Sequence, residues 1–273
     1  MGAFSLRGKV AVVTGAAGLL GRQHVAALAG AGADVVALDI LPEERLARAF
    51  ADDERGKGSA SIVPKSCDIT DAGSIARLRD FIIQRFTHID ILVNNAAINE
   101  MVEQPDAATA SVKFENFPLD AWERSVRVNL TGTFLCSQVF GSVMAERKSG
   151  SIINIASTYG IVAPDQGLYV REDGRRTMIK SPAYSATKGA VLAFTKYLAA
   201  YWGRAGVRVN ALSPGGVENG QEEDFIDRYA GRTMLGRMAR ADEYRGALIF
   251  LAGDESSYMT GANLVVDGGW TAW

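Results

Sequence analysis

Hydrophobic positions along the chain fall into two alternating patterns. Short continuous apolar runs rich in valine and isoleucine, such as VAVV at 10–13 and IINI at 152–155, predict strands buried on both faces. Between them, apolar residues recur every three or four positions, which predicts amphipathic helices. The strands are expected at residues 9–15, 34–39, 60–68, 89–96, 151–157, 207–215 and 263–269. The helices are expected at residues 19–32, 43–54, 74–86, 119–147, 183–204 and 243–253.

This alternation predicts one α/β domain over residues 1–273, built on a doubly wound parallel sheet of about seven strands. No linker, repeat or low-complexity tract divides the chain. Three longer segments, 98–117, 158–182 and 216–236, each follow a strand. Ligands bind at the carboxyl ends of strands in open α/β sheets, so these segments are expected to form a substrate mouth. The alternative is that they are surface loops without a function.

Composition narrows the possible partners. Apolar residues make up 48% of the chain, which is ordinary for a soluble globular protein. The net charge is −2, so the sequence does not indicate a positively charged surface that would bind nucleic acid or an anionic membrane. We expect no secretory signal and no membrane span. Cys67 and Cys136 are interpreted as core residues of a cytoplasmic protein rather than as a disulfide framework. His24 and His88 lie far apart in sequence, so no metal site is expected.

A glycine-rich turn follows the first predicted strand. In VVTGAAGLLGRQ, Gly15, Gly18 and Gly21 precede a helix, where backbone amides can approach a phosphate. Asp39 closes the second strand, and at that spacing a carboxylate can bind the adenosine ribose and repel a 2′-phosphate. The cofactor is therefore expected to be NAD rather than NADP. The alternative is that Asp39 only caps the helix beginning near Pro42.

The stretch SPAYSATKGA places Tyr184 and Lys188 one helical turn apart. Oxidation of an alcohol requires a base for the hydroxyl proton, and a free tyrosine titrates near pH 10. A positive charge ~4 Å away, at an effective dielectric constant of ~20, would lower the pKa of the tyrosine towards about 7. A single Tyr-x-x-x-Lys pair also arises by chance, so the other motifs must support this interpretation.

Together the motifs TGAAGLLG, CDITD, NNAA, VNLTGTF, IINIAS, YSATK and VNALSPGG resemble those of the short-chain dehydrogenase/reductase superfamily, in order and over almost the whole chain. The resemblance implies a single-domain Rossmann enzyme, usually a tetramer or dimer. Such an enzyme moves hydride between a nicotinamide cofactor and an alcohol or carbonyl substrate.

The resemblance also implies the site residues. The catalytic group would be Asn129, Ser157, Tyr184 and Lys188. In it, Ser157 would bind the substrate oxygen, Lys188 the nicotinamide ribose, and Asn129 a water molecule of a proton relay. The cofactor site would comprise Gly15, Gly18, Leu19, Leu20, Gly21, Asp39, Ile40, Asp68, Ile69, Asn95, Ala96, Ala97, Tyr184, Lys188, Pro214, Gly215 and Val217. Taken singly, Asn129 could instead bond the backbone and Ser157 could cap a turn.

The substrate is less well defined by the sequence. The chain is similar in pattern to bacterial sugar and polyol dehydrogenases and to oxidoreductases of surface glycans such as flagellin modifications, which implies a sugar, polyol or sugar acid. The predicted mouth carries polar residues that suit such a substrate or are merely solvated: Asp165, Gln166, Arg171, Glu172, Asp173, Arg175, Arg176, Glu218 and Asn219. The alternatives are a 3-oxoacyl-thioester reductase and a catalytically silent dinucleotide-binding scaffold.

Two further expectations follow from the resemblance. Asn219 could replace the threonine that the family often carries after Pro-Gly. A homo-oligomer is expected, with the small-residue face of helix 183–204, Trp270 and Trp273 as interface material.

Overall fold

The structure is a computed structural model that describes residues 4–51, 60–99, 113–170, 174 and 179–273. Two of the three segments predicted to form the mouth, 98–117 and 158–182, therefore lie partly outside the described residues. Five of the charged residues predicted for the mouth lie outside the described residues: Arg171, Glu172, Asp173, Arg175 and Arg176.

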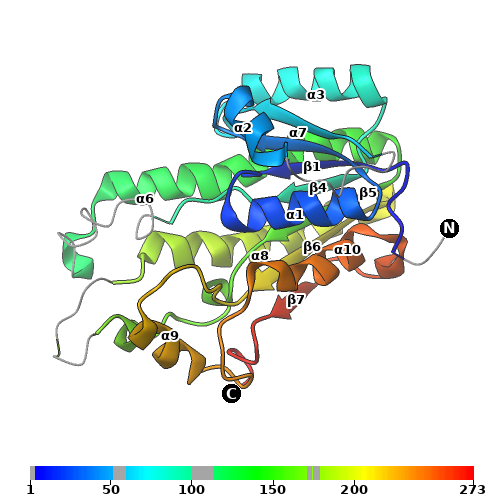
Figure 1. Cartoon of the computed structure of the whole chain (residues 1–273). Helices are drawn as coiled ribbons and strands as arrows, with labels where there is room; N and C mark the ends of the chain where they lie inside the picture. Colours follow the sequence, from blue (N-terminus) through cyan, green and yellow to red (C-terminus); the bar gives the residue numbers. More distant parts are fainter. Residues whose placement is uncertain (1–3, 52–59, 100–112, 171–173, 175–178) are drawn as a thin grey trace.

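Seven parallel strands form one sheet in the order β3-β2-β1-β4-β5-β6-β7, which confirms the predicted doubly wound α/β architecture (Figure 1). The strands are β1 (Val10–Thr14), β2 (Asp34–Asp39), β3 (Ile62–Ser66), β4 (Ile91–Asn94), β5 (Gly150–Ile155), β6 (Val207–Pro214) and β7 (Asn263–Val266). The chain order reverses between β1 and β4, which is where open sheets of this kind bind ligands.

Most of the helices lie where the hydrophobic periodicity predicts them. They are α1 (Leu19–Gly30), α2 (Glu43–Phe50), α3 (Ala72–Phe86), α6 (Leu119–Ser125), α7 (Thr133–Glu146), α8 (Pro182–Trp202), α9 (Glu223–Ala230) and α10 (Arg245–Ala252). The single helix expected at 119–147 is interrupted by a π-helical turn, Val126–Gly132, between α6 and α7. Helix α9 lies in the segment 216–236 and was not predicted.

Two hydrophobic layers cover the sheet. Along β1, Val13 packs into a cluster with α1 and α10, while Val12 packs into a second cluster with α3, α7 and α8. Figure 1 shows α1 and α10 side by side on one face of the sheet. The central strands are buried on both faces, as the apolar runs predict, because successive side chains point to opposite sides. The edge strand β3 is half-buried and accommodates Pro64, which a central strand would not.

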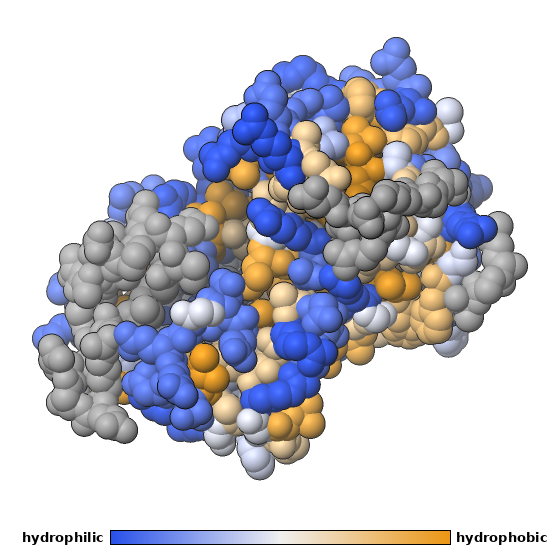
Figure 2. All heavy atoms as spheres, in the orientation of Figure 1, coloured by the Kyte–Doolittle hydropathy of each residue, from blue (hydrophilic) through white to orange (hydrophobic). Residues whose placement is uncertain are grey.

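On the face drawn in Figure 2, hydrophobic residues gather in patches between hydrophilic residues. None of the helices in the described ranges is long and apolar enough to cross a membrane. Within the same part of the chain, histidine, cysteine, aspartate and glutamate side chains form no group that could hold a metal ion.

Candidate nucleotide and catalytic site

The glycine-rich turn requires glycine for two different reasons. Gly15 has φ of +62°, and a Cβ atom on it would lie 2.7 Å from the Cα atom of Ala96. A Cβ atom on Gly21 would overlap the carbonyl oxygen of Gly15. The backbone of the turn can therefore pack closely against the segment after β4 and lead directly into α1.

The first turn of α1 has features of an anion site. Gly18 is its N-cap and supplies no side-chain hydrogen bond, and no acidic residue occupies the first turn. The first backbone amides of a helix have no partner within the helix and carry the positive end of its dipole. The N-terminus of α1 thus offers donors to a phosphate group.

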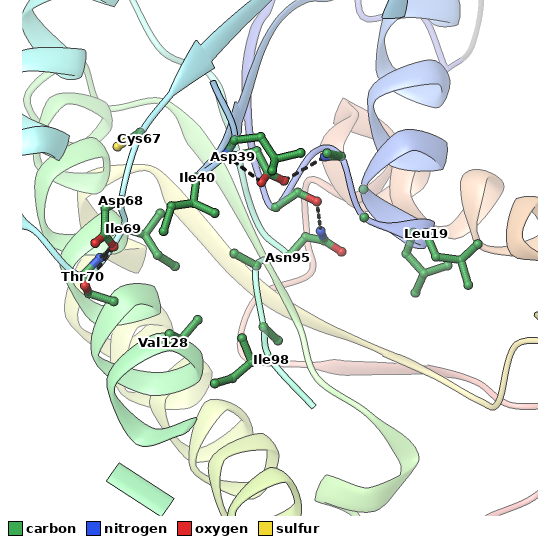
Figure 3. A pocket seen from close by; sticks show the side chains of 18 residues that line it. Leu19, Asp39, Ile40, Cys67, Asp68, Ile69, Thr70, Asn95, Ile98 and Val128 are labelled. Atoms are coloured by element: carbon green, nitrogen blue, oxygen red, sulfur yellow. Dashed lines mark hydrogen bonds between the residues drawn. The ribbon is translucent and has the colours of Figure 1, made fainter. Parts of the chain in front are cut away.

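A cavity of about 520 Å³ lies beside this turn, at the carboxyl ends of β1, β2 and β4 (Figure 3). Most of the predicted cofactor residues line it: Gly15, Gly18, Leu19, Leu20, Gly21, Asp39, Ile40, Asp68, Ile69, Asn95, Ala96 and Ala97. The sequence analysis missed six further lining residues: Ala17, Leu41, Cys67, Thr70, Ile98 and Val128. Five of these six adjoin predicted cofactor residues in sequence, and Val128, in the π-helical turn, adjoins Asn129 of the predicted catalytic group.

Asp39 lines the cavity, and its carboxylate connects the glycine-rich turn to the segment that follows β2. Its Oδ2 atom accepts a hydrogen bond from the backbone N–H of Ala17 at 3.0 Å, and its Oδ1 atom accepts one from Leu41 at 3.3 Å. The second bond lies just before α2, which begins after Pro42. The carboxylate therefore lines the cavity and orders the chain before α2, but it accepts no hydrogen bond from a residue of that helix and does not cap it.

Thr14 and Asn95 fix the junction of β1 and β4. The Nδ2 atom of Asn95 donates to the carbonyl oxygens of Thr14 and Gly15 at 2.9 and 3.0 Å. Thr14 Oγ1 in turn accepts hydrogen bonds from the backbone N–H groups of Asn95 and Ala96. Figure 3 shows Asn95 reaching across to the glycine-rich turn. These bonds fix the glycine turn, which follows β1, against the end of the neighbouring strand β4.

The predicted catalytic residues of β5 and α8 lie together. The side chain of Ser157 lies close enough to Tyr184 to act on the pKa of its phenol. The Nζ atom of Lys188 is buried, donates to the carbonyl oxygen of Ile155 at 2.6 Å, and lies 5.6 Å from the ring centroid of Tyr184. Ser157 also caps the turn Thr158–Gly160 by accepting from the N–H of Tyr159, so the alternative interpretation of Ser157 holds as well.

The pKa of Tyr184 differs from the sequence prediction. Burial raises the pKa of Tyr184, while the neighbouring side chain of Ser157 acts in the opposite direction. Burial also lowers the pKa of Lys188 to about 8. The predicted lowering of the pKa of Tyr184 is therefore wrong for the protein chain alone, because desolvation of the phenolate is the largest effect on this pKa.

Asn129 links the two halves of the site. Its Oδ1 atom accepts from the N–H of Ile98 at 2.8 Å, and its Nδ2 atom donates to the carbonyl oxygen of Ile98 and to Thr187 Oγ1. Ile98 lines the cavity, and Thr187 lies on α8 between Tyr184 and Lys188. The side chain therefore bonds the backbone, as one interpretation of the sequence has it. It sits in the π-helical turn, a feature that often marks functional sites.

Five predicted cofactor residues do not line this cavity: Tyr184 and Lys188, which belong to the catalytic group, and Pro214, Gly215 and Val217. Gly215 donates from its backbone to Val266, and Val217 pairs with Ala239. Asn219 is exposed, and its backbone N–H donates to Gln221, so nothing places its side chain in the cavity. Their contact with the cofactor stays a prediction.

The residues present fit a dinucleotide. The glycine turn excludes a Cβ atom at Gly15 and Gly21, the first turn of α1 offers free amides, and Asp39 lines the same cavity. The cavity between them is of the size that encloses a small organic ligand.

Comparison with known proteins agrees with this geometry. The family model described as enoyl-(acyl carrier protein) reductase matches residues 15–271. The crystal structure of a short-chain dehydrogenase from Leptospira borgpetersenii with bound NAD⁺ superposes with a TM-score of 0.80 at 30% identity, covering 98% of this chain and 94% of that one. The chain belongs to the short-chain dehydrogenase/reductase family.

Other members of the family are at least as similar. D-threitol dehydrogenase of Mycolicibacterium smegmatis is 36% identical over 98% of this chain and 95% of its own length. The structure of a gluconate 5-dehydrogenase from Burkholderia cenocepacia, in complex with NADP and tartrate, has a TM-score of 0.82 at 33% identity, covering 99% and 98% of the two chains. The predicted family, fold and enzyme class of this short-chain dehydrogenase/reductase are thus confirmed: it is an oxidoreductase with a nicotinamide-binding fold.

Proposed function

We propose that this enzyme transfers hydride between NAD and the secondary alcohol or ketone of a sugar, polyol or sugar acid. The observation that carries the proposal is the position of Ser157 beside Tyr184, close enough to act on the pKa of its phenol, with Lys188 one turn further along α8. Asn129 bonds both this helix and Ile98, a residue of the dinucleotide cavity. A hydroxyl pair of this kind is what an alcohol or ketone oxygen needs for binding and for proton transfer.

Each residue then has a chemical role. When bound, the nicotinamide supplies the hydride acceptor or donor. Ser157 holds the substrate oxygen and stabilises the charge that develops on it, while Tyr184 moves the hydroxyl proton. Because burial raises its pKa, Tyr184 is protonated at neutral pH in the chain alone and is ready to act as the acid for ketone reduction. Lys188 would hold the nicotinamide ribose, and Asn129 would position the water of a proton relay.

The preference for NAD rests on Asp39. Its carboxylate is fixed by Ala17 and Leu41 at the wall of the cavity, where a 2′-phosphate on the adenosine ribose would meet a like charge. Arg22, the first basic residue after the glycine turn, is directed to the carbonyl of Ala17 through its Nε atom. One solved relative is described with NAD⁺ and another with NADP, so our proposal of NAD rests on the negative charge of Asp39.

We also propose a cytoplasmic homo-oligomer. Phe134 on α7 contacts Phe194 on α8, which stacks on Tyr197, which in turn stacks on Tyr201. Tyr197 and Tyr201 are 63% and 67% exposed, and a continuous exposed aromatic stripe of this kind is typical of an interface. A second copy of the chain is the partner that the family resemblance suggests. Cys67 and Cys136 are buried free thiols, which suits a reducing compartment.

A panel of polyols, sugar acids and acyl thioesters, assayed with NAD and with NADP by nicotinamide absorbance, tests the proposal. We expect turnover of at least one polyol or sugar acid, with NAD preferred. Turnover of acyl thioesters alone would favour a thioester reductase. Tight binding of NADH by a folded protein that turns over no substrate would favour the scaffold interpretation.

A further inference from the structure

A second cavity, of about 580 Å³, opens beside the first turn of α8. Among the described residues, its charged and polar lining comprises Lys113, Glu115, Gln166, Lys180 and Ser185. The Oγ atom of Ser185 is buried and has no hydrogen-bond partner among the described residues. Buried hydroxyl groups are normally paired, so this one indicates a place for a polar group of a ligand.

Lys180 lies between this cavity and the catalytic tyrosine. Its Nζ atom is 4.7 Å from the ring centroid of Tyr184 and 5.5 Å from that of Tyr159. Gln166 Oε1 accepts a hydrogen bond from the backbone N–H of Lys180 at 2.9 Å, which fixes the chain just before α8. The ammonium of Lys180 is thus nearer to the catalytic ring than that of Lys188, which lies at 5.6 Å.

An ammonium group beside the catalytic ring suits an anionic ligand group. Asp165, at the start of the turn Gln166–Tyr169, forms an ion pair with Arg232 and so already has a cationic partner. Among the described residues that line the second cavity, Lys113 and Lys180 are cationic and Glu115 is anionic. A carboxylate that entered from this side would gain a charge-assisted hydrogen bond from Lys180.

We propose that Lys180 is a specificity-determining residue that binds a carboxylate of the substrate, so that the enzyme prefers hydroxy acids of the sugar-acid class to neutral polyols. This inference rests on the proposed function, because it takes the reacting hydroxyl to lie at Ser157 and Tyr184. A substrate of a few carbons can reach both positions, since Nζ of Lys180 already lies against the ring of Tyr184. The second cavity leaves room for the carboxylate end, with the hydroxyl of Ser185 as a further donor.

Matched substrate pairs test this inference. Threonate and threitol, xylonate and xylitol, and gluconate and glucitol differ at one terminal carbon, and kcat and KM are measured with NAD for each pair that is oxidised. We expect the wild type to have the higher kcat/KM for the acid. In Lys180→Met the acid-to-polyol ratio of kcat/KM should fall roughly tenfold to hundredfold, mainly through KM, because a charged hydrogen bond is lost.

Two further variants distinguish recognition of the substrate carboxylate from a general effect of removing a lysine. Lys180→Arg keeps the positive charge and should retain most of the preference for the acid. Lys196→Met removes an exposed lysine from the same helix and should leave the ratio unchanged.

A wild type that prefers the polyols would overturn the inference and leave the proposed function intact. Equal losses for acid and polyol in Lys180→Met would also overturn it, since that result means that Lys180 only tunes Tyr184 or supports the fold. Failure of the folded protein to oxidise any polyol or sugar acid would instead refute the proposed function, and this inference with it.

Discussion

The buried ammonium of Lys188 donates a hydrogen bond to the backbone carbonyl of Ile155, with 2.6 Å between Nζ and O. Ile155 ends β5, two residues before Ser157, and Lys188 follows Tyr184 by one turn of α8. One side chain therefore sets the strand that carries the serine against the helix that carries the tyrosine. This role is present in the protein chain itself, in addition to any contact with the cofactor.

The titration of Lys188 should be visible in the stability of the protein. Burial lowers its pKa to about 8, against 10.5 for an ordinary lysine, so between these values the unfolded chain binds a proton that the folded chain does not. The free energy of unfolding therefore rises with pH across this window. Relative to Lys188→Met, the wild type should gain about 2 kcal/mol between pH 7 and pH 9.5.

Urea unfolding of the two proteins without added nucleotide, at half-unit pH steps, measures this difference. The range stops at pH 9.5 because the raised pKa of Tyr184 has the opposite effect at higher pH, where the unfolded chain loses its phenolic proton first. A difference that stays constant over the range would mean that Lys188 titrates normally in the folded state.

Loss of the phenolic hydroxyl should stop the chemistry without disturbing the fold. In Tyr184→Phe we expect kcat to fall by at least about a thousandfold, because proton transfer and its partner hydrogen bond are both removed. Tyr197→Phe is the matched control, since Tyr197 is exposed on the same helix. Steady-state kinetics and NADH-binding titrations of both variants make the comparison. Near-normal turnover by Tyr184→Phe, with a substrate that the wild type uses, would refute the catalytic role.

The sequence predicted those parts of the fold and site that depend on local patterns. The seven strands follow from continuous apolar runs, and the glycine-rich turn needs Gly15 for its positive φ and Gly21 because a Cβ atom there would overlap Gly15. What it missed depends on contacts between distant segments. Asn129 bonds Ile98, 31 positions earlier, and this contact arises from a π-helical turn within an apparently regular helical pattern.

The direction of the pKa shift of Tyr184 was missed for a related reason. The spacing of Tyr184 and Lys188 places a cation near the phenol, but it gives no measure of how deeply both groups are buried. In the folded chain, burial raises the pKa of the tyrosine and lowers that of the lysine. Desolvation is a property of all the surrounding elements, so a four-residue motif cannot predict its size.

Removal of the carboxylate of Asp39 should weaken the discrimination against NADP. In Asp39→Ala we expect the NAD-to-NADP ratio of kcat/KM to fall roughly tenfold to hundredfold, since a fixed like charge no longer faces the 2′-phosphate. Asp120→Ala, which removes an exposed carboxylate from the first turn of α6, is the control. Initial rates with both cofactors at saturating substrate give the ratio. A wild type that already prefers NADP would contradict the role assigned to Asp39.

The buried imidazole of His24 should make the protein sensitive to mild acid. His24 lies on α1, has no exposed surface, and neither ring nitrogen has a hydrogen-bond partner among the described residues. Burial lowers its pKa to about 4, whereas an ordinary histidine titrates near 6.5. Between these values the unfolded chain takes up a proton that the folded chain does not, so this contribution to stability is present above pH 6.5 and is lost as the pH falls towards 4.

Replacement of His24 by leucine removes the titrating group and leaves an apolar side chain of similar size in an apolar layer. Between pH 7 and pH 5, the free energy of unfolding of the wild type should therefore fall by about 2 kcal/mol more than that of His24→Leu. At pH 7 the variant should be at least as stable as the wild type, because two unpartnered ring nitrogens no longer have to be buried. Urea unfolding at several pH values measures both effects, and parallel pH profiles for the two proteins would show that His24 is protonated as easily in the folded chain as in the unfolded one.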